Sequence, residues 1–262
     1  MPPHRPHDVS QRVSENAHEA AEHVRDNAHD AAIQVRAKVR YVKDEVKPHL
    51  RGWLHAATTP LALAAGIVLI VLSPTLTTRV GSAVFAFTAL MLFTVSAIYH
   101  RGHWSEGTWA FLRRFDHSNI FLLIAGSYTP FTLILLEGSA RIWLLVIVWS
   151  GAALGIAFRI FWTGAPRWLY TPIYIGLGWF ALFFIPDFIE GAARLSTPVA
   201  VATLVLVAAG GVLYTLGGVI YGLKKPNPKP EWFGFHEVFH TFTILAFISH
   251  YVAVSLATYA LR

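Results

Sequence analysis

The feature that most constrains this chain is a series of apolar runs of about 20 residues each, separated by short polar breaks. A run of this length is long enough to cross a hydrocarbon layer of ~30 Å as a helix. None of the runs keeps the alternation of a β-strand, and the helix is the spanning element when no barrel pattern is present. The sequence therefore predicts an all-α membrane protein, a bundle of seven transmembrane helices at about 54–73, 80–100, 116–136, 141–161, 169–187, 197–222 and 234–259.

The composition agrees with a chain that lies mostly in lipid. It is 55% hydrophobic and only 14% charged, whereas a soluble domain has about 25% charged residues. This disfavours a soluble globular enzyme. The sequence has no cysteine, which excludes disulfides, thiolate catalysis and cysteine-based metal sites. Any metal must therefore be held by His, Asp or Glu.

The first 48 residues differ from the rest and are expected to form a polar cytosolic tail. The stretch 15–25, ENAHEAAEHVR, is followed at once by a similar stretch at 26–36, DNAHDAAIQVR. This 11-residue period is close to three helical turns, so like residues fall on one face. We expect a cytosolic amphipathic helix that is solvated, lies on the membrane surface or pairs with a copy of itself as a homo-oligomer. Residues 49–262 then form the transmembrane domain.

Lys and Arg predict the orientation of the bundle. They are concentrated in the tail and in the breaks on the same side of the membrane, while the other side holds only Arg79, Arg141, Arg194 and Arg262. The positive-inside rule then places the N-terminus in the cytoplasm and the C-terminus outside, in an inner (plasma) membrane. The net charge of +6 is explained by anionic lipid on the cytoplasmic side, without nucleic acid as a partner.

Three predicted helices bring ionisable residues to one membrane depth, near the cytoplasmic face. His236 and His240 open the last helix within the string H-E-x-x-H, His100 ends the second helix, and Asp116 is expected to begin the third. His236 and His240 lie about 40° apart around the helix and about 6 Å apart along it, so one ion could bind both. His100 could complete a three-histidine set.

Three histidines with an open fourth position are typical of a catalytic zinc site rather than a structural one. Asp116 could then act on water at the metal as a proton acceptor, and Ser96, one turn before His100, is placed for a second-shell hydrogen bond. The alternative interpretation is a polar edge at the membrane interface, with Asp116 paired to the neighbouring arginines. It is the shared depth that favours the metal site.

The remaining ionisable residues near this region are assigned other roles. His250 follows His240 by ten residues, or about 15 Å along a helix, so we expect it to make an interior hydrogen bond or to line a cavity. His103 and His117 are expected to be solvated. Asp187 and Glu190 fall on the opposite side of the membrane.

Four stretches resemble the hemolysin III family, the bacterial branch of the progestin and adipoQ receptor superfamily, which includes the adiponectin receptors. They are SAIYH (96–100), FDHSNI (115–120), LIAGSYTPF (123–131) and FHEVFH (235–240), and the resemblance covers about 50–262. It implies a Zn²⁺ ion bound by His100, His236 and His240, with Asp116 contacting the metal through water. It also implies the orientation derived above. The family pattern does not demand an acid at Glu237, so a protease-like role for this glutamate is disfavoured.

Several functions stay open at this point. The first is a zinc-dependent hydrolase of a lipid amide, because the adiponectin receptors are linked to ceramidase activity; a ceramide-like or fatty-acyl lipid would be the ligand. Bacterial members are also linked to membrane-lipid homeostasis. The alternatives are a non-enzymatic lipid-sensing receptor with structural zinc, a pore-forming haemolysin and, least favoured, an intramembrane protease.

Overall fold

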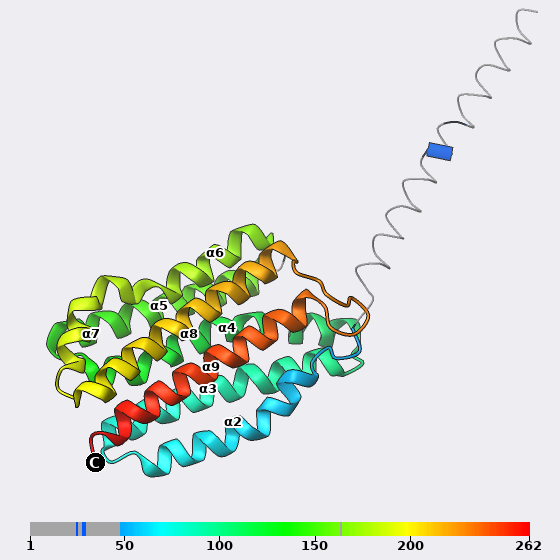
Figure 1. Cartoon of the computed structure of the whole chain (residues 1–262). Coiled ribbons are helices and arrows are strands. Elements are labelled where there is room, and N and C mark those ends of the chain that lie inside the picture. The colour runs from blue at the N-terminus through cyan, green and yellow to red at the C-terminus, as the bar shows by residue number, and fades with distance from the viewer. Residues whose placement is uncertain (1–24, 26–27, 30–47, 163) are drawn as a thin grey trace, which may run out of the picture. The chain divides into compact units, whose positions relative to one another are not determined.

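The computed structural model describes residues 25, 28–29, 48–162 and 164–262. The chain divides into two compact units, Met1–Lys47 and Pro48–Arg262. The predicted amphipathic helix and its pairing with a second copy lie almost entirely outside the described residues and stay predictions. The second unit is a bundle of long helices (Figure 1). Its elements are α2 (Trp53–Leu72), α3 (Leu76–Arg101), α4 (Glu106–Leu135), α5 (Gly138–Phe161), α6 (Arg167–Gly178), the 3-10 helix η1 (Phe180–Phe184), α7 (Ile185–Ala192), α8 (Thr197–Leu223) and α9 (Phe235–Tyr259).

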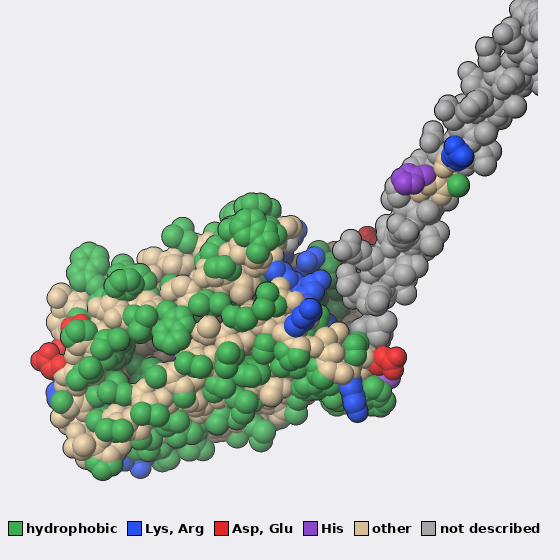
Figure 2. All heavy atoms as spheres, turned by 45° about the horizontal axis from the view of Figure 1, so that its top comes forward, with side chains coloured by type: hydrophobic (Ala, Val, Ile, Leu, Met, Phe, Trp, Pro, Cys, Tyr) green, Lys and Arg blue, Asp and Glu red, His purple; other side chains and the backbone are tan. Residues whose placement is uncertain are grey.

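The prediction of seven spanning helices is confirmed. Within the described residues, seven helical segments are long and apolar enough to cross a membrane, and α6, η1 and α7 together make one of them. Large apolar side chains are exposed on every one of these segments, and hydrophobic side chains cover most of the face seen in Figure 2. Such a surface is stable in contact with lipid rather than water. Which side of the membrane each end faces stays a prediction.

Two boundaries differ from the expected ones. The third span begins at Glu106, about three turns before 116, because the hydroxyl of Ser105 accepts a hydrogen bond from the backbone N–H of Thr108 and caps the helix there. Capping, not hydropathy, decides where this helix starts. Asp116 therefore lies inside α4 rather than at its beginning.

The fifth span is broken where a continuous helix is expected. Pro186 stands in the first turn of α7, where its missing N–H costs nothing. The hydroxyl of Tyr128 in α4 donates to the carbonyl of Gly178 at 2.6 Å and accepts from the N–H of Ala181 at 2.9 Å. These bonds satisfy the backbone at the break, which is the condition for irregular backbone at membrane depth.

The core of the bundle is α4, the most buried of the spans. It packs against α3, α5, α6, α7 and α9 (Figure 1). Close approach of these helices depends on small residues: Gly126 of α4 lies directly against Thr88 of α3, and Gly210 of α8 lies against the ring of His250. A side chain at either glycine would collide with its neighbour.

The segment before α2 closes the end of the bundle at which α9 begins. The N–H groups of His49 and Leu50 donate to the carbonyls of Glu231 and Trp232, at 2.9 and 3.2 Å. Gly52 then turns the chain with a φ of 79°, and a Cβ there would stand 2.8 Å from the Cβ of His100. Only glycine suits both the backbone angle and the space. The chain thus passes directly over His100 as it enters α2.

Candidate metal centre

Three histidines from two helices converge inside the bundle. His100 lies in the last turn of α3, and His236 and His240 lie in the first two turns of α9. One nitrogen atom from each ring lies within 4.8 Å of the others, and the Nε2 atoms of His100 and His236 are 3.1 Å apart. All three side chains are buried. The structure thus brings together the three histidines that the sequence analysis expected to meet.

The arrangement fits a metal ion held by nitrogen ligands. Ligands of a tetrahedral zinc at 2.0–2.1 Å stand about 3.3 Å from one another, close to the observed 3.1 Å between two of these nitrogens. The Nδ1 atom of His240 is buried, and no described residue offers it a hydrogen bond. A buried nitrogen of this kind normally has a partner. The group of His100, His236 and His240 could therefore hold a metal ion, and three ligands leave a further coordination position open.

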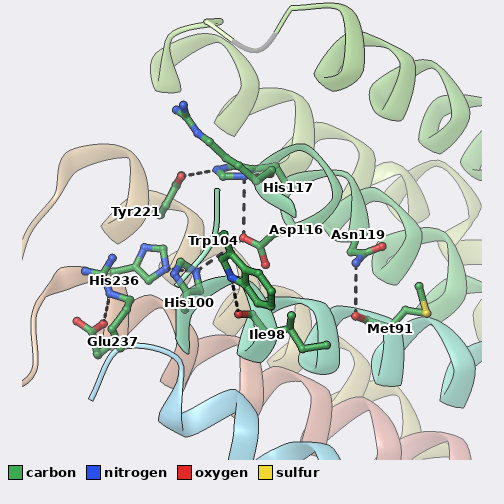
Figure 3. A network of polar contacts seen from close by, with 12 residues as sticks. Met91, Ile98, His100, Trp104, Asp116, His117, Asn119, Tyr221, His236 and Glu237 are labelled. Atoms are coloured by element: carbon green, nitrogen blue, oxygen red, sulfur yellow. Dashed lines mark hydrogen bonds and ion pairs between the residues drawn. The ribbon is translucent and has the colours of Figure 1, made fainter. Parts of the chain in front are cut away.

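Asp116 stands beside this group without touching it. Its Oδ2 atom is 3.8 Å from Nε2 of His100 and 3.9 Å from Nδ1 of His117. These distances exceed a direct hydrogen bond and suit a bridging water. Ser96, buried one turn before His100, lines the same cavity as Asp116. Figure 3 shows the carboxyl of Asp116 between His100 and His117. The carboxyl of Asp116 therefore lies near the three histidines, and its role there stays a prediction.

Glu237, the glutamate of H-E-x-x-H, is turned away from the three histidines and has a different role. Its Oε1 atom is 2.5 Å from Nε of Arg51, and its Oε2 atom accepts a hydrogen bond of 2.9 Å from the N–H of Gly234. Its side chain is 1% exposed. Glu237 therefore fixes the segment before α2 to the start of α9. The expectation that Glu237 is not a catalytic group agrees with this geometry. The residue has a structural role, because its ion pair and hydrogen bond hold these two segments together.

His55 is the residue that the sequence analysis missed. Its ring stacks on that of His240, with centroids 3.8 Å apart and planes 9° apart, and it is 2% exposed. Neither of its ring nitrogens has a hydrogen-bond partner among the described residues. A histidine in the first turn of the first span, at the end where the other three lie, is the signal that could have found it.

His236 and His240 line a mainly apolar cavity of about 430 Å³. At one end its wall includes His55, Ser96, Asp116, His236 and His240, and it continues between α4, α6, α8 and α9 towards Leu135, Ile185 and Leu204. His250 also lines it and has its Nε2 atom 3.2 Å from the carbonyl of Val207, both roles that the sequence predicts. The size is typical of a small-molecule or lipid-chain pocket.

The two solvated histidines expected from the sequence behave differently. His103 is exposed as expected. The expectation for His117 is wrong: its side chain is 12% exposed, its Nδ1 atom is 2.6 Å from the carbonyl of Arg113, and its Nε2 atom is 3.1 Å from the hydroxyl of Tyr221. The cause is the early start of α4, which carries His117 inside the bundle instead of leaving it in a polar break.

Comparison with known proteins adds two findings. The model of the family described as "Haemolysin-III related" matches residues 44–251. A protein of Bacillus cereus named "Hemolysin-3" is 33% identical over 210 residues, covering 78% of this chain and 87% of its own. A "Hemolysin-3 homolog" of Bacillus subtilis (strain 168) is 35% identical over 157 residues, covering 60% of this chain and 70% of its own.

Proposed function

Because this chain belongs to the haemolysin-III related family and is a multi-pass membrane protein, we propose that its three buried histidines bind zinc and that it hydrolyses the amide bond of a membrane lipid. The observation that carries the proposal is that a group of polar side chains and a mainly apolar cavity meet at the same place. His236, His240 and Asp116 line one end of a cavity whose wall is mainly apolar, and His100 stands beside His236. The polar end suits the reacting carbonyl, and the apolar part suits its acyl chain. A ceramide-like lipid has both parts.

Zinc is the ion we propose because the donors are imidazoles and the chain has no thiolate. The chemistry that zinc supplies at such a site is polarisation of a carbonyl and activation of water. The protein's own residues supply the rest. Asp116 is placed to accept a proton, and Ser96 orients its carboxyl. The apolar wall holds the acyl chain and keeps bulk water away from it.

The test uses the purified full-length chain in detergent micelles loaded with zinc. N-acyl lipids that differ in head group and chain length are incubated with it, and released fatty acid is measured by mass spectrometry. We expect release by the wild type and by His103→Gln, which alters an exposed histidine at the same end of the bundle. His236→Ala should abolish both release and metal content. A zinc-loaded wild type that releases nothing from the whole panel would refute hydrolysis.

A second candidate is a lipid-sensing protein with structural zinc. It is favoured by the fact that the three histidines come from α3 and α9, so an ion bound there would tie two helices that are far apart in the sequence. In that case chelation should lower the thermal stability while the cavity still binds lipid. The same preparation decides between the two candidates. Lipid binding without any release of fatty acid would favour the sensing protein over the hydrolase.

Haemolysis is what the names of the Bacillus relatives state. The exposed apolar side chains on every span of this chain are typical of a resident membrane protein, so we do not propose lysis as its function. Lysis of erythrocytes by detergent-free protein would contradict this choice.

A further inference from the structure

A second group of charged and polar side chains lies at the same end of the bundle, where α5, α6 and α8 meet α4. We call this group of side chains the arginine pocket and define it by Arg159, Arg167, Tyr170, Tyr221 and His117; the last two also line the cavity described above. It adjoins the metal centre through His117, whose Nδ1 atom is 3.9 Å from Asp116. It contains none of the three histidines of that centre, and its role does not depend on the proposed hydrolysis.

Arg159 is the residue that makes this group of side chains unusual. It lies in the last turn of α5 and is only 2% exposed. Its guanidinium carbon is 4.4 Å from the centre of the Tyr170 ring, which offsets part of the cost of burial through a cation–π contact. Its Nε and Nη1 atoms, however, have no hydrogen-bond partner among the described residues. No Asp or Glu carboxylate of the described residues forms an ion pair with Arg159. A buried charge without a counter-charge is strongly unfavourable.

A second guanidinium and two hydroxyl groups lie around it. The guanidinium carbon of Arg167 is 4.5 Å from the centre of the Tyr221 ring, and Nη1 of Arg167 donates to the carbonyl of Tyr221 at 3.3 Å. The hydroxyls of Tyr170 and Tyr221 are 3.3 Å apart. Both arginines are close enough to act electrostatically on His117. The group therefore combines two positive charges with several hydrogen-bond donors, and Arg167 is half-buried and so partly accessible from outside.

The position of the pocket along the helices indicates the source of an anion. Arg159 lies two residues before the end of α5, and Arg167 begins α6. Between and beside them, Phe161, Trp162 and Trp168 expose 87%, 52% and 75% of their surface. Exposed aromatic residues at the ends of spanning helices mark the level of the lipid head groups. A phosphate there could reach a guanidinium at the helix end, and guanidinium groups bind phosphate in a planar, bidentate manner.

We propose that the arginine pocket binds a phosphate group, supplied by the head group of a membrane phospholipid, and that Arg159 and Arg167 are its ligands. The bound phosphate supplies the missing counter-charge of Arg159. It would also fix the inner ends of α5 and α6 beside α4, next to the cavity. Figure 2 agrees with this placement, since Lys and Arg side chains gather at this end of the bundle.

The experiment compares three probes on the full-length chain after delipidation in a phosphate-free buffer. Native mass spectrometry measures retention of dioleoyl phosphatidylglycerol and of dioleoylglycerol, which has the same chains and no phosphate. Thermal unfolding measures the effect of inorganic phosphate. We expect the phospholipid to be retained in preference to the neutral lipid, and Arg159→Met to weaken its binding roughly 10-fold to 100-fold, the range for hydrogen bonds to charged groups.

Arg114→Gln is the matched control, because Arg114 is an exposed arginine of α4 at the same end of the bundle. It removes one positive charge without touching the pocket and should leave retention unchanged. If Arg159→Met does not fold, Arg167→Gln and the wild-type comparison of the two lipids carry the test.

Each outcome bears on the proposal. Stabilisation by inorganic phosphate that Arg159→Met abolishes, without preference for the phospholipid, would keep the phosphate site and replace its source by a soluble ion. Equal retention of the two lipids together with no effect of phosphate would overturn the site. Equal losses in Arg159→Met and Arg114→Gln would also overturn it, because binding would then follow total charge and not the pocket.

Discussion

The two halves of the cavity make an instructive comparison, since both contain buried histidines of the same helix. In the histidine half, His236 and His240 of α9 meet His100 of α3, and His55 of α2 stacks on His240. In the far half, His250 contacts the carbonyl of Val207 and the rings of Phe131 and Tyr214, and no second histidine among the described residues stacks on it. Burial and helix are the same in both halves. The difference is that nitrogen donors from several helices come together only in the histidine half. We conclude that burial alone does not produce a candidate metal site, and that donors from different helices must meet.

The largest effect is expected from removing a ligand in the histidine half. His236→Ala should reduce bound zinc from a single ion per chain to background, with at least a roughly 100-fold loss of affinity, because one of three donors is lost. His250→Ala should leave the metal content unchanged. Metal content is measured by inductively coupled plasma mass spectrometry after gel filtration. Loss of metal in His250→Ala would break the comparison.

The next effect concerns how tightly each end of the bundle is fixed. Glu237→Gln should lower the free energy of unfolding by about 2 kcal/mol, because it removes the charge from a buried, hydrogen-bonded pair. The matched control is Glu137→Gln at the far end, where Glu137 pairs with Arg194 at 3.4 Å but is 67% exposed. It should cost less than about 0.5 kcal/mol. Equilibrium unfolding in mixed micelles measures both. Equal losses of free energy of unfolding in the two variants would contradict the structural role assigned to Glu237.

A smaller effect is expected for His55, which acts on the metal centre through His240. His55→Ala should weaken zinc binding about tenfold, within the range found when groups that orient a ligand are removed. His55→Phe keeps a flat ring against His240 and should restore most of the affinity. Competition with a fluorescent zinc chelator measures the difference. If the phenylalanine variant is as weak as the alanine variant, His55 contributes a nitrogen and not a stacking surface.

The smallest effect is expected in the far half. His250→Leu removes one hydrogen bond to Val207 and fills the same space with an apolar side chain, so the free energy of unfolding should change by less than about 1 kcal/mol. Zinc binding should not change. A loss of several kcal/mol would show that the far half holds a polar network that its side chains do not form in this structure.

The sequence was sufficient for the features that follow from local pattern. Hydropathy predicted seven spans, and the spacing of His236 and His240 predicted that both rings face the same place. His100 and Asp116 could be added because the ends of spanning helices fall at a common depth. The start of α4 could not be predicted this way, since the cap at Ser105 lies outside the apolar run. The error carried over to His117, which was assigned to solvent.

The features that hydropathy could not supply depend on which helices are neighbours. Arg51 and Glu237 are 186 residues apart in the chain, and nothing local pairs them. His55 lies beside the three histidines because α2 packs against α9, and Arg159 is buried where the end of α5 meets Tyr170 of α6.

The sequence by itself determined the class of protein, the number of spans and the three histidines, because lipid imposes a length and an apolar pattern on each helix separately. The tertiary structure decided the rest: the stack of His55 on His240, the ion pair of Glu237 with Arg51, and the buried guanidinium of Arg159, whose Nε and Nη1 atoms have no hydrogen-bond partner among the described residues. The physical reason is that packing between helices in a membrane depends on small residues and on individual side-chain contacts, and these have no period that a single sequence reveals.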